Sequence, residues 1–177
     1  MSIFVIADLH LSFKNPKPMD IFGDNWTKHE EKIKKDWNEK VKEEDLVVLP
    51  GDFSWATYIE DTIPDFEYLN SLPGKKIMLK GNHDYWWTTV TSMRKFLKEN
   101  NFQNIDFLYN NSFEYENKIL SEEEMKFIEL MKKYNVKRCY YGHLHGNSIY
   151  DAIEGKIQGI ELKLVSADGL DFKLIKI

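Results

Sequence analysis

The sequence has a single cysteine, only five prolines and no long apolar run. Cys139 cannot form an internal disulfide, so we expect a reduced, cytoplasmic protein. The apolar stretch Ile3–Ala7 is too short for the core of a signal peptide and lacks a basic flank, and no stretch has the length of a membrane span. The formal net charge of -5 also argues against nonspecific binding to nucleic acid. These absences leave a soluble globular protein, for which 42% apolar and 30% charged residues are ordinary values.

The first hundred residues alternate between apolar strands and amphipathic helices. Short, continuously apolar runs predict three buried strands, at Ile3–Ala7, Leu46–Leu49 and Ile77–Leu79. Apolar residues at spacings of three and four predict helices over about 27–42, from Pro64 to Leu72, and from Val90 to about Asn100. Thr27 and Glu30 form a candidate capping box for the first helix, on which His29 is expected to be solvated. This alternation is typical of a parallel sheet with helices packed against it.

The second half contains more strands than helices. The predicted strands are Phe107–Tyr109, Phe113–Ile119, Val136–Tyr141, Ser148–Ile153, Ile157–Val165 and Leu170–Ile177, with turns at Asn110-Asn111, Glu154-Gly155 and Asp168-Gly169. Ser121 and Glu124 suggest a second capping box, opening a helix that buries Met125, Ile128 and Met131. A chain of 177 residues can build one substantial core, and no linker or repeat interrupts it. We expect one domain with two sheets.

Four of the five histidines fall in short polar motifs that follow predicted strands. These motifs are Asp8-Leu9-His10, Gly51-Asp52, Gly81-Asn82-His83-Asp84 and Gly142-His143-Leu144-His145. The ends of parallel strands gather along one edge of an α/β sheet, where ligands bind. Asp8 and His10 are two positions apart, so an extended backbone would point both side chains the same way. We therefore expect the motifs to meet at one site.

Carboxylate, imidazole and amide groups are the ligands of a hard or borderline divalent ion. That mixture is supplied by Asp8, His10, Asp52, Asn82, His143 and His145. Two ions about 3.5–4 Å apart can clamp an in-line displacement at phosphorus, and a metal-bound water deprotonates near neutral pH. The charge of two dications exceeds that of Asp8 and Asp52, and the surplus attracts a phosphate. The composition of the motifs therefore indicates a metal site suited to phosphate chemistry.

Each motif alone is a weak signal, because Asp-x-His and Gly-Asn-His-Asp also occur in ordinary turns. Only the four together, each at a predicted strand end, indicate metal binding. A structural zinc site is disfavoured, because the candidate ligands include no cysteine and are spread over the chain. Aromatic residues near the motifs are expected to serve packing: the core for Trp26, Trp37 and Trp55, and the core or its rim for Trp86 and Trp87.

In this order the motifs resemble those of the calcineurin-like metallophosphoesterase superfamily. The resemblance spans nearly the whole chain and is closest to the small bacterial phosphohydrolases, in which an aromatic stretch like Tyr85-Trp86-Trp87 follows the third motif. It implies a four-layer α/β/β/α sandwich over residues 1–177. It also implies a site for two ions of Mn, Fe, Zn, Co or Ni, and hydrolysis of a small phosphorylated substrate by a metal-bound hydroxide.

The resemblance also assigns roles to individual residues. By motif, one ion is assigned to Asp8, His10, Asp52 and His145, and the other to Asp52, Asn82 and His143. His83, oriented by Asp84, resembles the histidine that contacts phosphate and protonates the leaving group. These two are therefore the expected catalytic residues.

One expected ligand is missing. The family has a further metal-binding histidine between its third and last motifs, whereas this chain has none between His83 and His143. Around Asn117–Ser121 a predicted strand leads almost directly into a helix, so the chain looks internally shortened and its second sheet reduced. We predict that the second ion binds weakly or not at all. Unpaired edges of that sheet would favour association between chains.

Two hypotheses stay open. In the first, the protein is a metal-dependent phosphomonoesterase or phosphodiesterase. In the second, it binds about one ion per chain and is a catalytically impaired member, acting as a scaffold or a shortened variant. Metal stoichiometry measured beside an aryl-phosphate assay distinguishes them.

Overall fold

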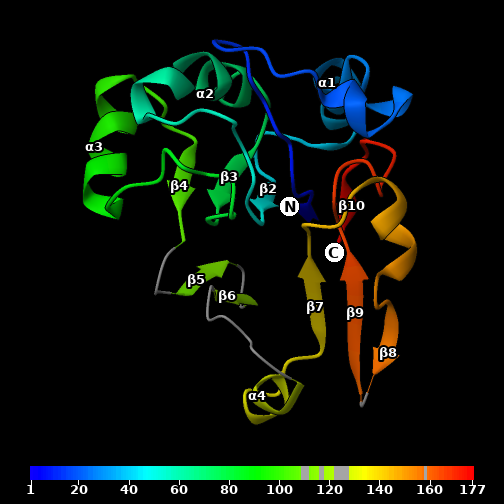
Figure 1. Ribbon diagram of the computed structural model, residues 1–177. Coiled ribbons are helices and arrows are strands. Elements are labelled where there is room, and N and C mark those ends of the chain that lie inside the picture. Colours follow the sequence, from blue (N-terminus) through cyan, green and yellow to red (C-terminus); the bar gives the residue numbers. More distant parts are fainter. Residues whose placement is uncertain (109–111, 116–117, 122–127, 158) are drawn as a thin grey trace.

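The computed structural model describes residues 1–108, 112–115, 118–121, 128–157 and 159–177. The larger sheet has five strands in the order β10-β1-β2-β3-β4 (Figure 1). They are β1 (Ile3–Val5), β2 (Leu46–Leu49), β3 (Lys75–Met78), β4 (Ile105–Phe107) and β10 (Ile175–Lys176). The pairs from β1 to β4 are parallel, and β10 runs antiparallel to β1. The three predicted parallel strands are confirmed, with one further strand at each edge.

Three helices cover one face of this sheet (Figure 1): α1 (His29–Lys40), α2 (Ile63–Asn70) and α3 (Val90–Glu99). Successive strand side chains point to opposite faces, so β1 feeds two cores. Phe4 and Ile6 belong to the cluster that contains the helix residues Ile33, Trp37 and Phe66, whereas Ile3 and Val5 belong to a second cluster. The continuous apolar run at the start of the chain reflects this burial on both faces.

The second sheet packs on the other face. Its strands β7 (Arg138–Tyr141), β9 (Ile160–Leu164) and β8 (Gly155–Ile157) lie in the order β7-β9-β8. Tyr140 and Val165 pack with Ile3 and Val5 of β1, which places an apolar core between the sheets. The helix α4 (Ile128–Lys133) contacts β9. The predicted α/β/β/α sandwich is confirmed.

The two sheets are joined where the first motif begins. Ala7 N–H donates to Val165 O at 2.8 Å, and Ala167 N–H donates to Ala7 O at 3.0 Å. This parallel bridge brings residues 166–168 beside Asp8. The C-terminal part of the chain therefore lies next to the first motif.

Several predicted elements of the second half are wrong. Phe113–Ile119 is not one strand, because the chain reverses between β5 (Ser112–Tyr115) and β6 (Lys118–Ser121), which pair antiparallel. Ser121 is the last residue of β6, and the capping box predicted for Ser121 and Glu124 extends beyond the described residues. The turn at Asn110-Asn111 and the helical residues Glu124 and Met125 lie outside the described residues.

Four predicted strands are shorter, divided or absent. Ser148–Ile153 coincides with a 3-10 helix, Gly146–Asp151, because the Ser148 hydroxyl bonds to His145 O at 2.6 Å and closes a turn. Ile157–Val165 is divided between β8 and β9, and Leu170–Ile177 contributes only β10, which belongs to the first sheet. Among the described residues, the strand expected at Phe107–Tyr109 is β4, which ends at Phe107.

The predicted cap of α1 is also wrong. Thr27 N–H donates to Asp24 O at 3.1 Å at the end of a 3-10 helix, Asp24–Trp26, so its backbone serves that turn. Lys28, in the left-handed region with φ 54°, precedes α1 without a side-chain cap. No helix within the described ranges is long and apolar enough to traverse a bilayer.

Candidate metal centre

All four motifs converge beyond the ends of β1, β2, β3 and β7. Pairing of the first two motifs continues the β1–β2 ladder, because Asp8 N–H donates to Gly51 O and His10 N–H to Asp52 O, both at 3.0 Å. The chain is not extended there, as the sequence had suggested: φ is 58° at Asp8, 47° at His10 and 50° at Asp52. Left-handed backbone at non-glycine residues costs energy and is concentrated at functional sites. The left-handed turns aim the side chains into the space between the motifs.

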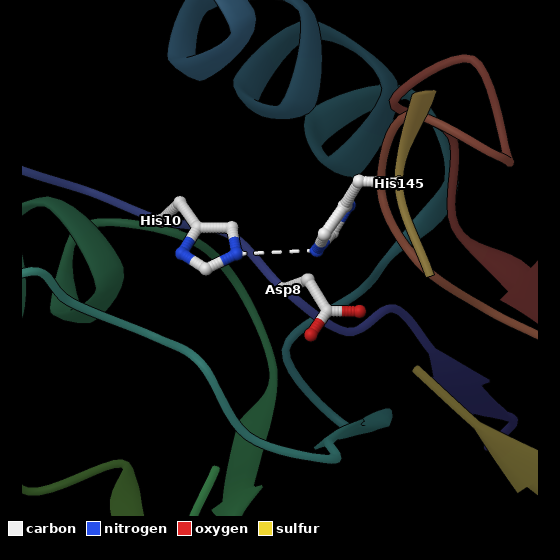
Figure 2. Close-up of side chains that lie close together, drawn as sticks. All are labelled: Asp8, His10 and His145. Carbon is white, nitrogen blue, oxygen red and sulfur yellow. Dashed lines mark hydrogen bonds between the residues drawn. The ribbon is translucent and has the colours of Figure 1, made fainter. Parts of the chain in front are cut away.

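The first ligand group consists of Asp8, His10 and His145 (Figure 2). Ligand atoms of these residues all lie within 4.8 Å of one another. Figure 2 shows one ring nitrogen of His10 pointing at one of His145, with the Asp8 carboxylate beside them, and His10 Nε2 lies 3.3 Å from His145 Nε2. Two nitrogens bound to one tetrahedral ion at about 2.0–2.1 Å would be about 3.3–3.4 Å apart. The spacing therefore fits a shared metal ion.

Burial sets the protonation of this group. Asp8 and His10 are 3% and 2% exposed. Burial, with the neighbouring histidines adding to it, lowers the pKa of His10 to about 2, so its imidazole is neutral and can act as a ligand. Burial raises the pKa of Asp8, an effect opposed by the hydrogen bond from His143 N–H at 2.9 Å. A cation between them would offset the cost of burying the carboxylate.

Asp168 completes the first group and was not identified from the sequence. Its carboxylate accepts hydrogen bonds from His145 Nδ1 and from Gly146 N–H, both at 2.9 Å. An Nδ1–H donated to a carboxylate leaves Nε2 of His145 unprotonated and directed at His10. In the sequence Asp168-Gly169 is indistinguishable from a surface turn. Its role appears only once the bridge between the sheets has brought it beside Asp8.

The second ligand group consists of His10, Asp52 and His83. The Asp52 carboxylate accepts His83 N–H at 2.8 Å and lies 2.9 Å from His83 Nδ1. Asn82 and His143, which the resemblance assigns to the second ion, are next to it: Asn82 Oδ1 lies 2.9 Å from His143 Nδ1. Asp52 is 2% exposed, whereas Asn82 and His143 are exposed. The six predicted ligands thus gather at one site, divided between a buried group and a more open one.

Asp84 does not orient His83 as expected. Its carboxylate accepts N–H groups of Gly81, Asp52 and Phe53 at 2.8–2.9 Å, and the Trp86 indole N–H at 3.0 Å. Burial raises its pKa to about 6, although these backbone donors oppose the shift. Consecutive residues of a turn can point to opposite sides. Here the Asp84 side chain is buried against the backbone of the second and third motifs. It holds their backbone together, and Asp52 contacts the His83 ring instead.

Aromatic side chains form one wall of the site. The Trp55 ring stacks on His10 at 4.8 Å between centroids and lies 4.7 Å from His83, so it is half-buried beside the ligands instead of fully in the core. Trp26 is buried as predicted, 5.6 Å from the His145 ring. Trp37, Trp86 and Trp87 are buried as well. Low polarity around a metal strengthens its electrostatic interactions.

The expectation of a solvated His29 is wrong. The side chain is buried, with Nε2 3.0 Å from Leu9 O and Nδ1 3.2 Å from Trp26 O. Leu9 separates Asp8 from His10, so this contact ties the start of α1 to the first motif. The first residue of α1 faces inward, which a capping pattern alone does not reveal.

Comparison with known proteins bears on the same residues. The family model described as calcineurin-like phosphoesterase matches residues 1–147, which include every predicted ligand. The crystal structure of a protein of unknown function, AQ665 from Aquifex aeolicus, is similar with a TM-score of 0.60 and 20% sequence identity. That alignment covers 99% of this chain and 95% of the other, and it shows a shared fold. A search of curated proteins found no significant match.

Proposed function

Because the chain belongs to the calcineurin-like phosphoesterase family, we propose that it hydrolyses a phosphate ester with the help of divalent metal ions. One observation carries the proposal: His10 Nε2 and His145 Nε2 lie 3.3 Å apart beside the Asp8 carboxylate. When bound, such an ion polarises a phosphoryl oxygen and lowers the pKa of the water that it binds. Imidazole and carboxylate ligands suit Mn, Fe, Co, Ni or Zn.

The side chains of the site would have different roles toward the two ions. Asp8, His10 and His145 would hold the first ion together with Asp52, as the family pattern implies. Asp168 keeps the proton of His145 on Nδ1, and the Trp26 and Trp55 rings limit access of bulk water to the ligands. Asp52, Asn82 and His143 would contribute to the second ion. By resemblance, His83 would donate a proton to the leaving group. Its contact with Asp52 favours a different role.

The test is an aryl-phosphate assay with added Mn, Co or Zn ions. We expect metal-dependent turnover that falls by at least about a hundredfold in the His145→Ala variant, because that substitution removes a ligand of the buried ion. The Asp171→Asn variant is the control. Asp171 is exposed, and its carboxylate accepts a hydrogen bond from the ammonium of Lys173. Turnover no greater than that of the free metal, from folded and metal-loaded protein, would refute the proposal.

The impaired alternative rests on a separate observation. No histidine occurs between His83 and His143, so the family's second ligand set is one residue short. In that case the protein would bind about one ion per chain and show no turnover. Metal analysis of the assayed sample separates the two cases.

The proposal also covers the extent of the domain, its location and its association. We propose a single domain over residues 1–177 acting on a small phosphorylated substrate in the cytoplasm, in keeping with the unpaired thiol of Cys139. In the described part of the chain, β7 and β8 are the outer strands of the second sheet, so their edges are where association would occur. Light scattering measures the mass of the assembly.

A further inference from the structure

His83 stands inside the ligand set of the second ion. The residues assigned to that ion by resemblance are Asp52, Asn82 and His143. The His83 ring is between two of them, with Nδ1 2.9 Å from Asp52 Oδ2 and 3.2 Å from Asn82 Nδ2. Asn82 Oδ1 in turn lies 2.9 Å from His143 Nδ1. The contacts therefore run without a break from the Asp52 carboxylate through the His83 imidazole and the Asn82 amide to His143.

The ring of His83 is held in place on three sides. The backbone N–H of His83 donates to Asp52 Oδ1 at 2.8 Å, so one carboxylate contacts both the main chain and the ring of His83. The Trp55 ring packs at 4.7 Å between centroids, and the His10 ring lies 5.7 Å away. Ligand atoms of His10, Asp52 and His83 all lie within 4.8 Å of one another. A histidine that reached out to a leaving group would have to give up these contacts.

We propose that His83 is a ligand of the second metal ion and takes the place of the histidine that the chain lacks. The ligands would be one imidazole and one carboxylate from His83 and Asp52, with Asn82 and His143 adjacent. That combination suits the same borderline divalent ions as the first group. The inference deepens the proposed function, since it concerns the same site, but its metal-binding part requires no substrate.

A consequence follows for the substrate. With His83 bound to metal, its imidazole is not available to protonate a leaving group; Tyr85, two residues on, is 62% exposed with its ring 6.3 Å from His83. In the reaction, the oxygen of water bonds to phosphorus, the bond from phosphorus to the leaving oxygen breaks, and the leaving group departs as an anion. The proton of the water passes to solvent. Substrates would therefore be aryl phosphates or phosphoanhydrides, whose leaving groups are stable anions, and not alkyl phosphates.

The first experiment counts metal ions. After dialysis against Mn or Co ions, we expect two ions per wild-type chain and one per His83→Ala chain, with the tighter ion retained. Affinity for the second ion should fall by more than the roughly 10–100-fold that loss of an outer partner costs. The Tyr85→Phe variant is a matched control in the same turn and should keep two ions. Imidazole added to the His83→Ala protein should restore the second ion.

Two results would overturn the assignment: a wild-type chain that takes up only one ion, or a His83→Ala chain that binds the second ion as tightly as wild type. Should the alanine variant fail to fold, His83→Gln decides the question. Its amide retains a donor for Asp52 but is a weaker ligand than imidazole, so the second ion should bind more weakly to a protein of unchanged secondary structure.

The second experiment varies the leaving group. With Mn ions present, kcat/KM should fall by several orders of magnitude from nitrophenyl phosphate to phenyl phosphate to an alkyl phosphate. Hydrolysis of the alkyl ester within about tenfold of the aryl ester would show that a side-chain acid is present and would contradict the inference. If no ester is hydrolysed, the proposed function fails, while the metal count still decides whether His83 is a ligand.

Discussion

The Asp168 carboxylate lies 2.9 Å from Nδ1 of His145, on the side of the ring opposite the nitrogen that faces His10. Asp168 is 8% exposed and has no lysine or arginine partner among the described ion pairs, so its charge is directed at the imidazole and at two backbone N–H groups. Burial acts to lower the pKa of His145, but the hydrogen bond and charge of Asp168, with Asp8 and Asp52, raise it overall. The carboxylate therefore fixes the ring and makes its other nitrogen a stronger ligand.

We predict that Asp168→Asn weakens binding of the first metal ion by about 10–100-fold. The amide cannot accept from His145 Nδ1 in the same way when its NH2 group faces the ring, so the imidazole is free to rotate or change tautomer. Titration calorimetry or competition with a chelator measures the affinity. Asp171→Asn, on the exposed side of the same segment, should bind metal as wild type does. Equal affinities for the Asp168→Asn variant and wild type would show that His145 is positioned by its neighbours alone.

Gly142 is placed so that any side chain would strike the first ligand group. A Cβ atom there would overlap Asp8 Oδ2 and lie 2.9 Å from the Ala7 Cβ. We predict that Gly142→Ala displaces Asp8, abolishes tight binding of the first ion and destabilises the fold by about 1–3 kcal/mol, as overpacking does. Gly169→Ala is the matched control, because its nearest neighbours would be 3.4 Å or more away. Retention of the ion in the Gly142→Ala protein would mean that Asp8 is not required.

Asp84 should behave as a structural residue. Its carboxylate satisfies at least four N–H groups beneath the motifs. An unsatisfied buried group costs about 1–3 kcal/mol, so we predict that Asp84→Ala lowers the free energy of unfolding by at least about 3 kcal/mol. Chemical denaturation measures the loss. Asp106→Asn, which removes the charge from an exposed pair with Arg94 and leaves an amide oxygen to accept Phe107 N–H, should cost less than about 1 kcal/mol. A stable Asp84→Ala protein with lost activity would restore the catalytic role expected from the sequence.

The sequence predicted that the ligands gather at one site, but not which partner each side chain contacts there. Asp8, Asp52 and His143 each follow an apolar strand, and parallel strands deliver their ends to one edge, so the gathering of ligands follows from local pattern alone. Which neighbour each side chain contacts depends on tertiary packing. Asp168 meets His145 only through the bridge at Ala7, and Asp84 turns beneath the motifs while His83 turns toward Asp52.

Dependence on tertiary packing also explains the wrongly predicted strands in the second half of the chain. Ser148 was assigned to a strand from its apolar neighbours, but its hydroxyl closes a turn at His145. Leu170–Ile177 reads as one strand, yet Leu174 is buried in the helix-side core and only Ile175–Lys176 pairs, with β1. Short apolar runs indicate burial more reliably than they indicate the sheet to which a segment belongs.

Lys76 provides a test of electrostatics away from the metal centre. Its side chain is 1% exposed on β3, and its ammonium donates to Leu72 O. Burial lowers the pKa of Lys76 from 10.5 to about 8, partly offset by Glu43. Between those pH values the unfolded chain holds the proton that the folded protein has released, so the wild-type protein should become more stable as pH rises from about 8 toward 10.5.

Replacement of Lys76 by methionine removes the cost of burying the charge. We predict that Lys76→Met raises the free energy of unfolding at pH 7 by up to about 3 kcal/mol, the free-energy equivalent of a pKa lowered from 10.5 to about 8, less the contribution of the lost hydrogen bond. The advantage should shrink as pH approaches 10, because neutral lysine is cheap to bury. Denaturation at pH 7 and pH 10 measures both values. Lys75→Met, at the exposed preceding position, should show no such pH-dependent difference. A destabilised Lys76→Met protein at pH 7 would mean that the bond to Leu72 O outweighs the cost of desolvating the ammonium.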